Sequence, residues 1–144
     1  YPPEGIRGSG AALARASRFS SVADYTVTAN AELCLIVQVE SRAGLAALPE
    51  LLEVEGVDAV FIGPPDLACD MGHAGMSRAA EVQEAIREAL AQISASPKAA
   101  AILATDDETA LKYRDWGAQV LAVGIDVLLF ASAARALADR WRDG

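Results

Sequence analysis

Two carboxylates, Glu40 and Asp66, have the residue type and spacing that could bind a metal ion. Glu40 ends the apolar segment CLIVQVE, and Gln38, two positions earlier, falls on the same side of an extended strand. Asp66 follows a Gly-Pro-Pro sequence after the next apolar segment, and these residue types favour a rigid turn. Neighbouring carboxylates repel each other unless a cation lies between them, and all-oxygen ligands suit Mg²⁺ or Mn²⁺. The alternative is that Glu40 pairs with Arg42 or a helix N-terminus, while Asp66 only caps a turn.

The elements that must position these groups alternate along the chain. Four compact apolar segments have the composition of strands buried on both faces of a parallel sheet. They cover residues 34–40, 57–63, 99–104 and 119–124. Helical patterns separate and follow them at residues 42–54, 78–93, 105–116 and 128–141, with a weaker helix at 10–19. This order predicts an α/β fold with a parallel sheet and right-handed crossovers, in which ligands bind at the carboxyl ends of the strands.

The helix over residues 105–116 has the best-marked ends. Thr105 and Glu108 fit a capping box at its start, and Gly117 fits the C′ position after its end. Four strand–helix units in 144 residues amount to half of an eight-unit barrel, although a doubly wound sheet satisfies the same pattern. No linker interrupts the run, so we expect a single domain over residues 1–144, and the absence of an initial Met suggests a piece of a longer chain.

The composition excludes several classes of function. With 12 basic and 20 acidic residues the net charge is −8, which argues against a nucleic-acid partner, because phosphate binding needs clustered Lys and Arg. No apolar run approaches the roughly 18 to 20 residues of a membrane span, and the N-terminus lacks a signal-peptide pattern. We therefore expect a cytoplasmic protein. Cys34 and Cys69 are expected to be reduced core thiols rather than a disulfide.

Four motifs of the chain resemble those of the HpcH/HpaI aldolase and citrate lyase family of metal-dependent pyruvate aldolases. They are YPPEGIRGSG at residues 1–10, VQVES at 37–41, EVEGVDAVFIGPPDLACDMG at 53–72 and LAVGID at 121–126. The resemblance covers essentially the whole chain. It implies a (β/α)8 TIM barrel of the phosphoenolpyruvate/pyruvate-binding type, of which this chain is the C-terminal half, strands five to eight.

The resemblance also implies the roles of the site residues. Glu40 and Asp66 would be the ligands of a divalent metal, Mg²⁺, Mn²⁺ or Co²⁺, with Gln38 beside them in a pyruvate pocket. In such enzymes the metal binds the carboxylate and keto oxygens of a 2-oxo acid, so that the enolate is neutralised as it develops. The loop expected to hold the pyruvate carboxylate consists of Gly63, Pro64, Pro65, Asp66 and Leu67.

Some residues depart from the family pattern or fall outside it. Pro65 stands where the family usually has an N–H donor, which leaves the amides of Asp66 and Leu67. The family's oxyanion-stabilising Arg and its proton-transferring His lie on the first half of the barrel, so no catalytic residue is assigned on this chain. His73, the only histidine, is expected to be a solvated loop residue rather than the base. Asp70 is a candidate support for the metal ligands.

Arg7, in the first of these motifs, has two interpretations. It either lines the mouth of the active site or contacts a neighbouring subunit, or it braces its own loop against Glu4.

The predicted function is that of a metal-dependent aldolase, a carbon–carbon lyase that cleaves 4-hydroxy-2-oxo acids to pyruvate and an aldehyde. The resemblance further implies a role in aromatic compound catabolism and a homo-oligomer. Two alternatives stay open: a lyase acting on citryl- or malyl-CoA-type thioesters, and a non-catalytic half-barrel that binds or assembles without turnover. Apolar strand edges at residues 34–40 and 119–124 predict that the isolated chain self-associates.

Overall fold

The computed structural model describes residues 1–142 and divides the chain into two compact units. The first unit, Tyr1–Cys34, contains only short helical turns. These are η1 (Ala11–Leu13), η2 (Arg15–Ser17), α1 (Tyr25–Thr28) and η3 (Ala29–Glu32). The helix expected over residues 10–19 is wrong, because Ala14 between η1 and η2 is extended, with φ −103° and ψ 144°. The single domain over residues 1–144 stays a prediction.

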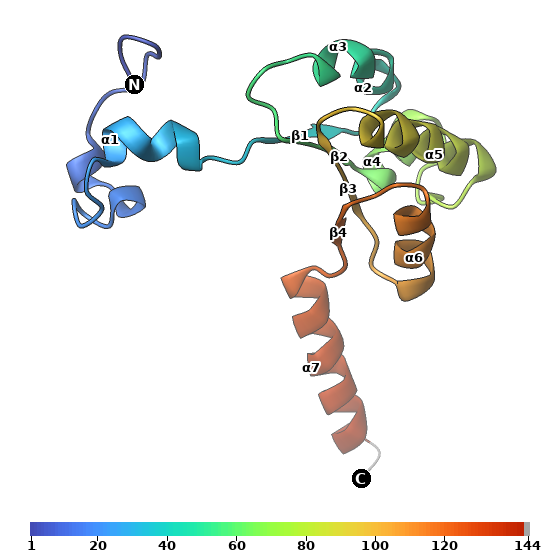
Figure 1. Ribbon diagram of the computed structural model, residues 1–144. Helices are drawn as coiled ribbons and strands as arrows, with labels where there is room; N and C mark the ends of the chain where they lie inside the picture. Colours follow the sequence, from blue (N-terminus) through green and yellow to red (C-terminus); the bar gives the residue numbers. More distant parts are fainter. Residues whose placement is uncertain (143–144) are drawn as a thin grey trace. The chain divides into compact units, whose positions relative to one another are not determined.

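The second unit, from Leu35 onward, contains a four-stranded parallel sheet with strand order β1-β2-β3-β4 (Figure 1). Helices follow each strand, so the predicted α/β fold with a parallel sheet is confirmed. The strands are β1 (Ile36–Val39), β2 (Ala59–Ile62), β3 (Ala99–Leu103) and β4 (Val120–Ala122). The helices are α2 (Arg42–Ala46), α3 (Leu48–Leu52), α4 (Pro64–Asp70), α5 (Ala80–Ser94), α6 (Asp107–Asp115) and α7 (Asp126–Arg142).

One face of this sheet forms the hydrophobic core with the helices. The parallel register aligns Val39 with Ile62 and Ile62 with Ile102, so their side chains point to the same face, and all three are buried. Helix α5 covers this face with an apolar stripe at the predicted spacing. Its fully buried residues are Val82, Ile86, Leu90 and Ile93.

The other face of the sheet has little cover. Gln38 aligns with Phe61 on this face. At the edge strands, Ile36 and Val120 of this face are 46% and 43% exposed, whereas Ala59 and Ala101 on the inner strands are buried. Burial on both faces was therefore the right expectation for the inner strands β2 and β3 and the wrong one for the edge strands β1 and β4. We call Ile36, Gln38, Phe61 and Val120 the uncovered sheet face.

Helix α7 has no buried residue, and Figure 1 shows it extending away from the sheet. Its exposed apolar side chains include Val127, Leu128, Leu129, Phe130 and Leu137. Within residues 1–142 no helix has the length and apolar character needed to cross a bilayer. A 17-residue helix with its apolar side chains in water lacks the packing from which helices in proteins gain most of their stability.

Local chemistry explains where the helix predictions were wrong. The helix expected over residues 42–54 is split into α2 and α3, and Pro49 lies in the first turn of α3. Proline has no N–H to continue a helix and its ring clashes with the preceding turn, so it begins a new helix instead. Helix α6 is capped by Asp106, whose carboxylate accepts the Thr109 N–H at 3.0 Å, not by Thr105. Gly117 takes the left-handed C′ position as predicted, with φ 108°.

The two cysteines are free, as expected, but both are exposed, so their placement in the core was wrong. Cys69 lies on α4, whose buried positions include Leu67 and Ala68. The buried residues of α4 recur every three or four positions from Pro64, and Cys69 is not one of these positions, so its side chain faces water. Cys34 ends the first unit, before the sheet begins.

Candidate metal site

Glu40 follows β1 directly, and its side chain lies against Gly63, which follows β2. The Gly63 N–H donates to the Val39 carbonyl at 3.1 Å, which holds the two strand ends together. A Cβ added to Gly63 would lie 2.8 Å from Glu40 Oε2 and 3.1 Å from Glu40 Cβ. Any other residue at this position would therefore force the Glu40 side chain to move. The parallel register thus places the carboxyl ends of β1 and β2 together, as the sequence predicted.

Asp66 is the third residue of α4 and is exposed. Pro64 and Pro65 begin the helix, where their missing N–H groups would have no helical partner in any case. Leu67 is fully buried, and its N–H donates to the Gly63 carbonyl at 3.0 Å. Of the two amides expected to hold a substrate carboxylate, the Leu67 amide is therefore already bonded within the loop, and the Asp66 amide is the remaining candidate.

The structure gives other partners to the groups that could have neutralised Glu40. The Arg42 guanidinium lies 2.8 Å from Glu81 Oε1, and the Ser41 hydroxyl accepts the Gly44 N–H to cap α2. In the described part of the chain, neither Glu40 nor Asp66 takes part in an ion pair. The pairing of Glu40 with Arg42, one form of the non-metal alternative, is therefore not found among the described residues.

The donors near these strand ends fit a hard divalent cation. Glu40 and Asp66 supply carboxylate oxygens, and the side chain of Gln38 belongs to the same sheet face as Phe61. Across residues 1–142 no group of three or more His, Cys, Asp or Glu side chains could hold a metal. A site with two carboxylates suits a cation that keeps several waters or substrate oxygens, as Mg²⁺ does.

Arg42 and Asp70 connect the segments that carry Glu40 and Asp66, an interaction that the sequence did not reveal. Asp70 Oδ2 accepts the Arg42 backbone N–H at 2.7 Å, and Arg42 Nη2 donates to the Met71 carbonyl at 3.3 Å. His73 Nε2 lies 3.0 Å from Glu81 Oε2, so this histidine is paired rather than merely solvated. The hydrogen bonds from His73 and Arg42 lower the pKa of the Glu81 carboxyl.

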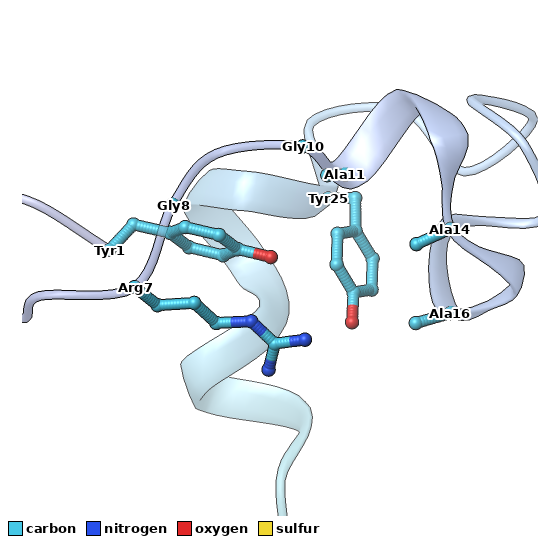
Figure 2. A pocket seen from close by; sticks show the side chains of 8 residues that line it. All are labelled: Tyr1, Arg7, Gly8, Gly10, Ala11, Ala14, Ala16 and Tyr25. Carbon is cyan, nitrogen blue, oxygen red and sulfur yellow. The ribbon is translucent and has the colours of Figure 1, made fainter.

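Arg7 lies in the first unit and lines a hollow of about 240 Å³ there. Figure 2 shows its guanidinium and the ring of Tyr1 extending into this hollow, with the ring of Tyr25 on another side. The structure contains no ion pair between Arg7 and Glu4 among the residues it describes, so the bracing interpretation is not supported.

The fold and the site together define an α/β protein with an all-oxygen candidate metal site at the carboxyl ends of its parallel strands. Comparison with known families makes the assignment specific. The chain belongs to the HpcH/HpaI aldolase/citrate lyase family, whose sequence model matches residues 1–133.

Individual relatives agree with this membership. The chain is 61% identical over 142 residues to a hydroxypyruvate/pyruvate aldolase of Roseovarius nubinhibens, covering 99% of this chain and 55% of the relative. It is 52% identical over 141 residues to a 4-hydroxy-2-oxo-heptane-1,7-dioate aldolase of Escherichia coli, covering 98% and 54%. A crystal structure of a family member from Burkholderia cenocepacia superimposes with a TM-score of 0.85 at 36% identity, covering 97% and 54%. The chain thus spans about half the length of the relatives it matches.

Proposed function

We propose that the protein containing this chain is a divalent-metal-dependent aldolase that cleaves 4-hydroxy-2-oxo acids to pyruvate and an aldehyde. The names of the relatives from Roseovarius nubinhibens and Escherichia coli support this reaction class. The observation on this chain that carries the proposal is the Glu40 carboxylate, held against Gly63 while Arg42 pairs with Glu81. A carboxylate kept at a strand end without a cationic partner from the described residues is suited to a metal ion.

The proposal assigns each site residue a task. Glu40 and Asp66 would hold Mg²⁺, Mn²⁺ or Co²⁺, and Gln38 would contact the 2-oxo acid beside them. A divalent cation bound there supplies positive charge that offsets the negative charge developing on the pyruvate unit as the carbon–carbon bond breaks. The loop from Gly63 to Leu67 would lie along the substrate carboxylate. Because Pro64 and Pro65 lack N–H groups and the Leu67 N–H is bonded to the Gly63 carbonyl, this loop donates through the Asp66 amide alone.

We also propose that the sheet is half of a (β/α)8 barrel wall, strands five to eight. The sequential strand order supports this, and so does the placement of the core on only one face of the sheet. In a closed barrel, the uncovered sheet face would line the interior, and the exposed edges of β1 and β4 would each gain a neighbour. The exposed apolar side chains of α7 support a homo-oligomer. A cytoplasmic location completes the proposal.

The experiment follows exchange of the pyruvate methyl protons in D₂O by proton NMR, with Mg²⁺ and the protein that contains this chain. We expect exchange that EDTA abolishes and that Glu40→Gln reduces to background. Glu50→Gln is the matched control, since Glu50 is an exposed carboxylate on α3, and it should exchange like the unchanged chain. Exchange that survives both EDTA and Glu40→Gln would contradict the proposal.

A further inference from the structure

Arg42, Asp70 and Glu81 form a network that joins the segments carrying Glu40 and Asp66. Arg42 follows Glu40 by two residues, and Asp70 follows Asp66 by about one helical turn. We propose that this network is a positioning device that fixes the separation of the Glu40 and Asp66 carboxylates and thereby sets the affinity for the divalent metal. The inference rests on the proposed function, because it takes these two carboxylates as the metal ligands.

Helix α4, which carries Asp66, is held at both ends to the chain that leaves β1. At its start, the Gly63 N–H donates to the Val39 carbonyl at 3.1 Å. At its end, Asp70 Oδ2 accepts the Arg42 N–H at 2.7 Å. Two attachments on one short helix define its direction, whereas a single attachment would let it pivot. Asp66 lies between the two attachments, so its position relative to Glu40 depends on both.

The second attachment is built from backbone groups that helices leave unbonded. The Arg42 N–H is the first of α2 and has no partner within that helix, and the Asp70 carboxylate supplies one. In return, Arg42 Nη2 donates to the carbonyl of Met71, the C-cap residue of α4. The start of α2 and the end of α4 therefore satisfy each other, and separating them would leave both groups without these partners.

Glu81 extends the network to a third helix. It is the second residue of α5, and its Oε1 accepts from Arg42 Nη2 at 2.8 Å. His73 Nε2 lies 3.0 Å from the other carboxylate oxygen, which leaves Glu81 bonded on both sides. Helix α5 packs with Ile86 and Leu90 fully buried in the core, so Glu81 connects the Arg42 side chain to a helix that is anchored in the core.

The test measures Mn²⁺ binding to the full chain from the EPR signal of the free ion. Partners that orient metal ligands without touching the metal typically change affinity by about 10- to 100-fold. We expect Asp70→Ala to raise the Mn²⁺ dissociation constant about tenfold, at the low end of that range, and Asp70→Asn, which keeps an oxygen acceptor, to restore most of it. Arg87→Ala is the control, because Arg87 is exposed and its guanidinium pairs with Glu84 within α5.

Two further measurements separate positioning from simple destabilisation. The visible absorption of bound Co²⁺ reports ligand geometry and should change in Asp70→Ala at temperatures well below its unfolding midpoint. Arg42→Met removes the bonds to Met71 and Glu81 but keeps the backbone N–H for Asp70, so it should weaken Mn²⁺ binding less than Asp70→Ala does. If Asp70→Ala does not fold, Mn²⁺ binding by Arg42→Met tests the positioning role in its place.

The outcomes test the positioning role of the network separately from the metal site of Glu40 and Asp66. Mn²⁺ binding that Glu40→Gln abolishes, but that Asp70→Ala and Arg42→Met leave unchanged, would overturn the positioning role and leave the metal site standing. A folded chain without any Glu40-dependent Mn²⁺ binding would overturn the proposed function and the positioning role together. Weakened binding in Asp70→Ala with recovery in Asp70→Asn supports the inference.

Discussion

Lys98 offers a sharp test of how the sheet is held at the amino ends of its strands. It precedes β3, is only 9% exposed, and its Nζ donates to the carbonyls of Val54 and Val57 at 2.7 and 2.8 Å. Both carbonyls belong to the segment that leads into β2. Lys98→Met keeps most of the aliphatic stem in place but removes every donor, so the substitution isolates the two hydrogen bonds.

The expected cost follows from the burial of the two acceptors. Val57 is buried, so its carbonyl would lose its partner without gaining water, at about 1–3 kcal/mol. Val54 is half exposed, and its carbonyl can bond to water at little cost. Methionine avoids the desolvation of an ammonium group, which offsets part of the loss. The net expectation is a loss of about 1–2 kcal/mol in the free energy of unfolding.

The assay is urea unfolding of the full chain, with Lys112→Met as the comparison at the only other lysine. A slope of about 1–2 kcal/mol per molar urea converts the expected loss to a midpoint shift of about 0.5–2 M. Lys112 is exposed, although its Nζ bonds to Gln83 Oε1 at 2.8 Å and lies 4.6 Å from the centre of the Trp116 ring. Because water can replace these contacts, Lys112→Met should shift the urea midpoint less than Lys98→Met does. A Lys98→Met midpoint equal to that of the unchanged chain would refute the reasoning, since the ammonium's desolvation would then cancel its bonds.

Three more outcomes can be checked. Gly63→Ala should weaken Mn²⁺ binding about tenfold or more, because the added Cβ would lie 2.8 Å from Glu40 Oε2. Calorimetry would measure the Mn²⁺ dissociation constant. The pKa of the Asp106 carboxyl is lowered, chiefly because this carboxylate accepts the Thr109 N–H. Its contribution to stability is therefore complete above its unfolded pKa of 3.8 and is lost as the pH falls through its lower folded pKa. Asp106→Asn should therefore flatten the acid side of the melting-temperature profile. Phe130→Ser, on the exposed face of α7, should reduce self-association in sedimentation velocity.

Patterns that depend on near neighbours in the chain predicted much of the second unit. The apolar spacing of α5 and the left-handed glycine after α6 are set within one or two helical turns, and both were found as expected. The adjacency of the strand ends that precede Glu40 and Gly63 also followed, because parallel strands bring consecutive carboxyl ends together. Thr105 and Asp106 are both good capping residues, and their sequence alone could not decide which one begins the helix.

Contacts between distant parts of the chain were beyond such patterns. Arg42 pairs with Glu81, which lies 39 positions later in the chain. Nothing in the sequence around Arg42 indicates that it binds Glu81 rather than Glu40 or solvent. The engaged amide of Leu67 is likewise a result of how α4 begins, which depends on two prolines taking up helical positions. Solvent exposure of β1 and β4 was missed because apolar composition describes what a strand prefers, not whether another element is there to cover it.

The sequential order of the sheet has a consequence for how the second unit folds. Every strand pairs with the next one in the chain, so each pairing closes only the loop made by the one or two helices between them. The paired residues Ala59 and Ala99 of β2 and β3 are 40 positions apart in the chain, slightly more than twice the 19 positions between the paired residues Ala101 and Val120 of β3 and β4. A doubling of loop length adds only about 0.6 kcal/mol of closure entropy, which the buried stripe of α5 readily outweighs. We therefore expect the pairing of β2 with β3 around α5 to form the folding nucleus, with the edge strands added afterwards and exchanging their amide hydrogens fastest.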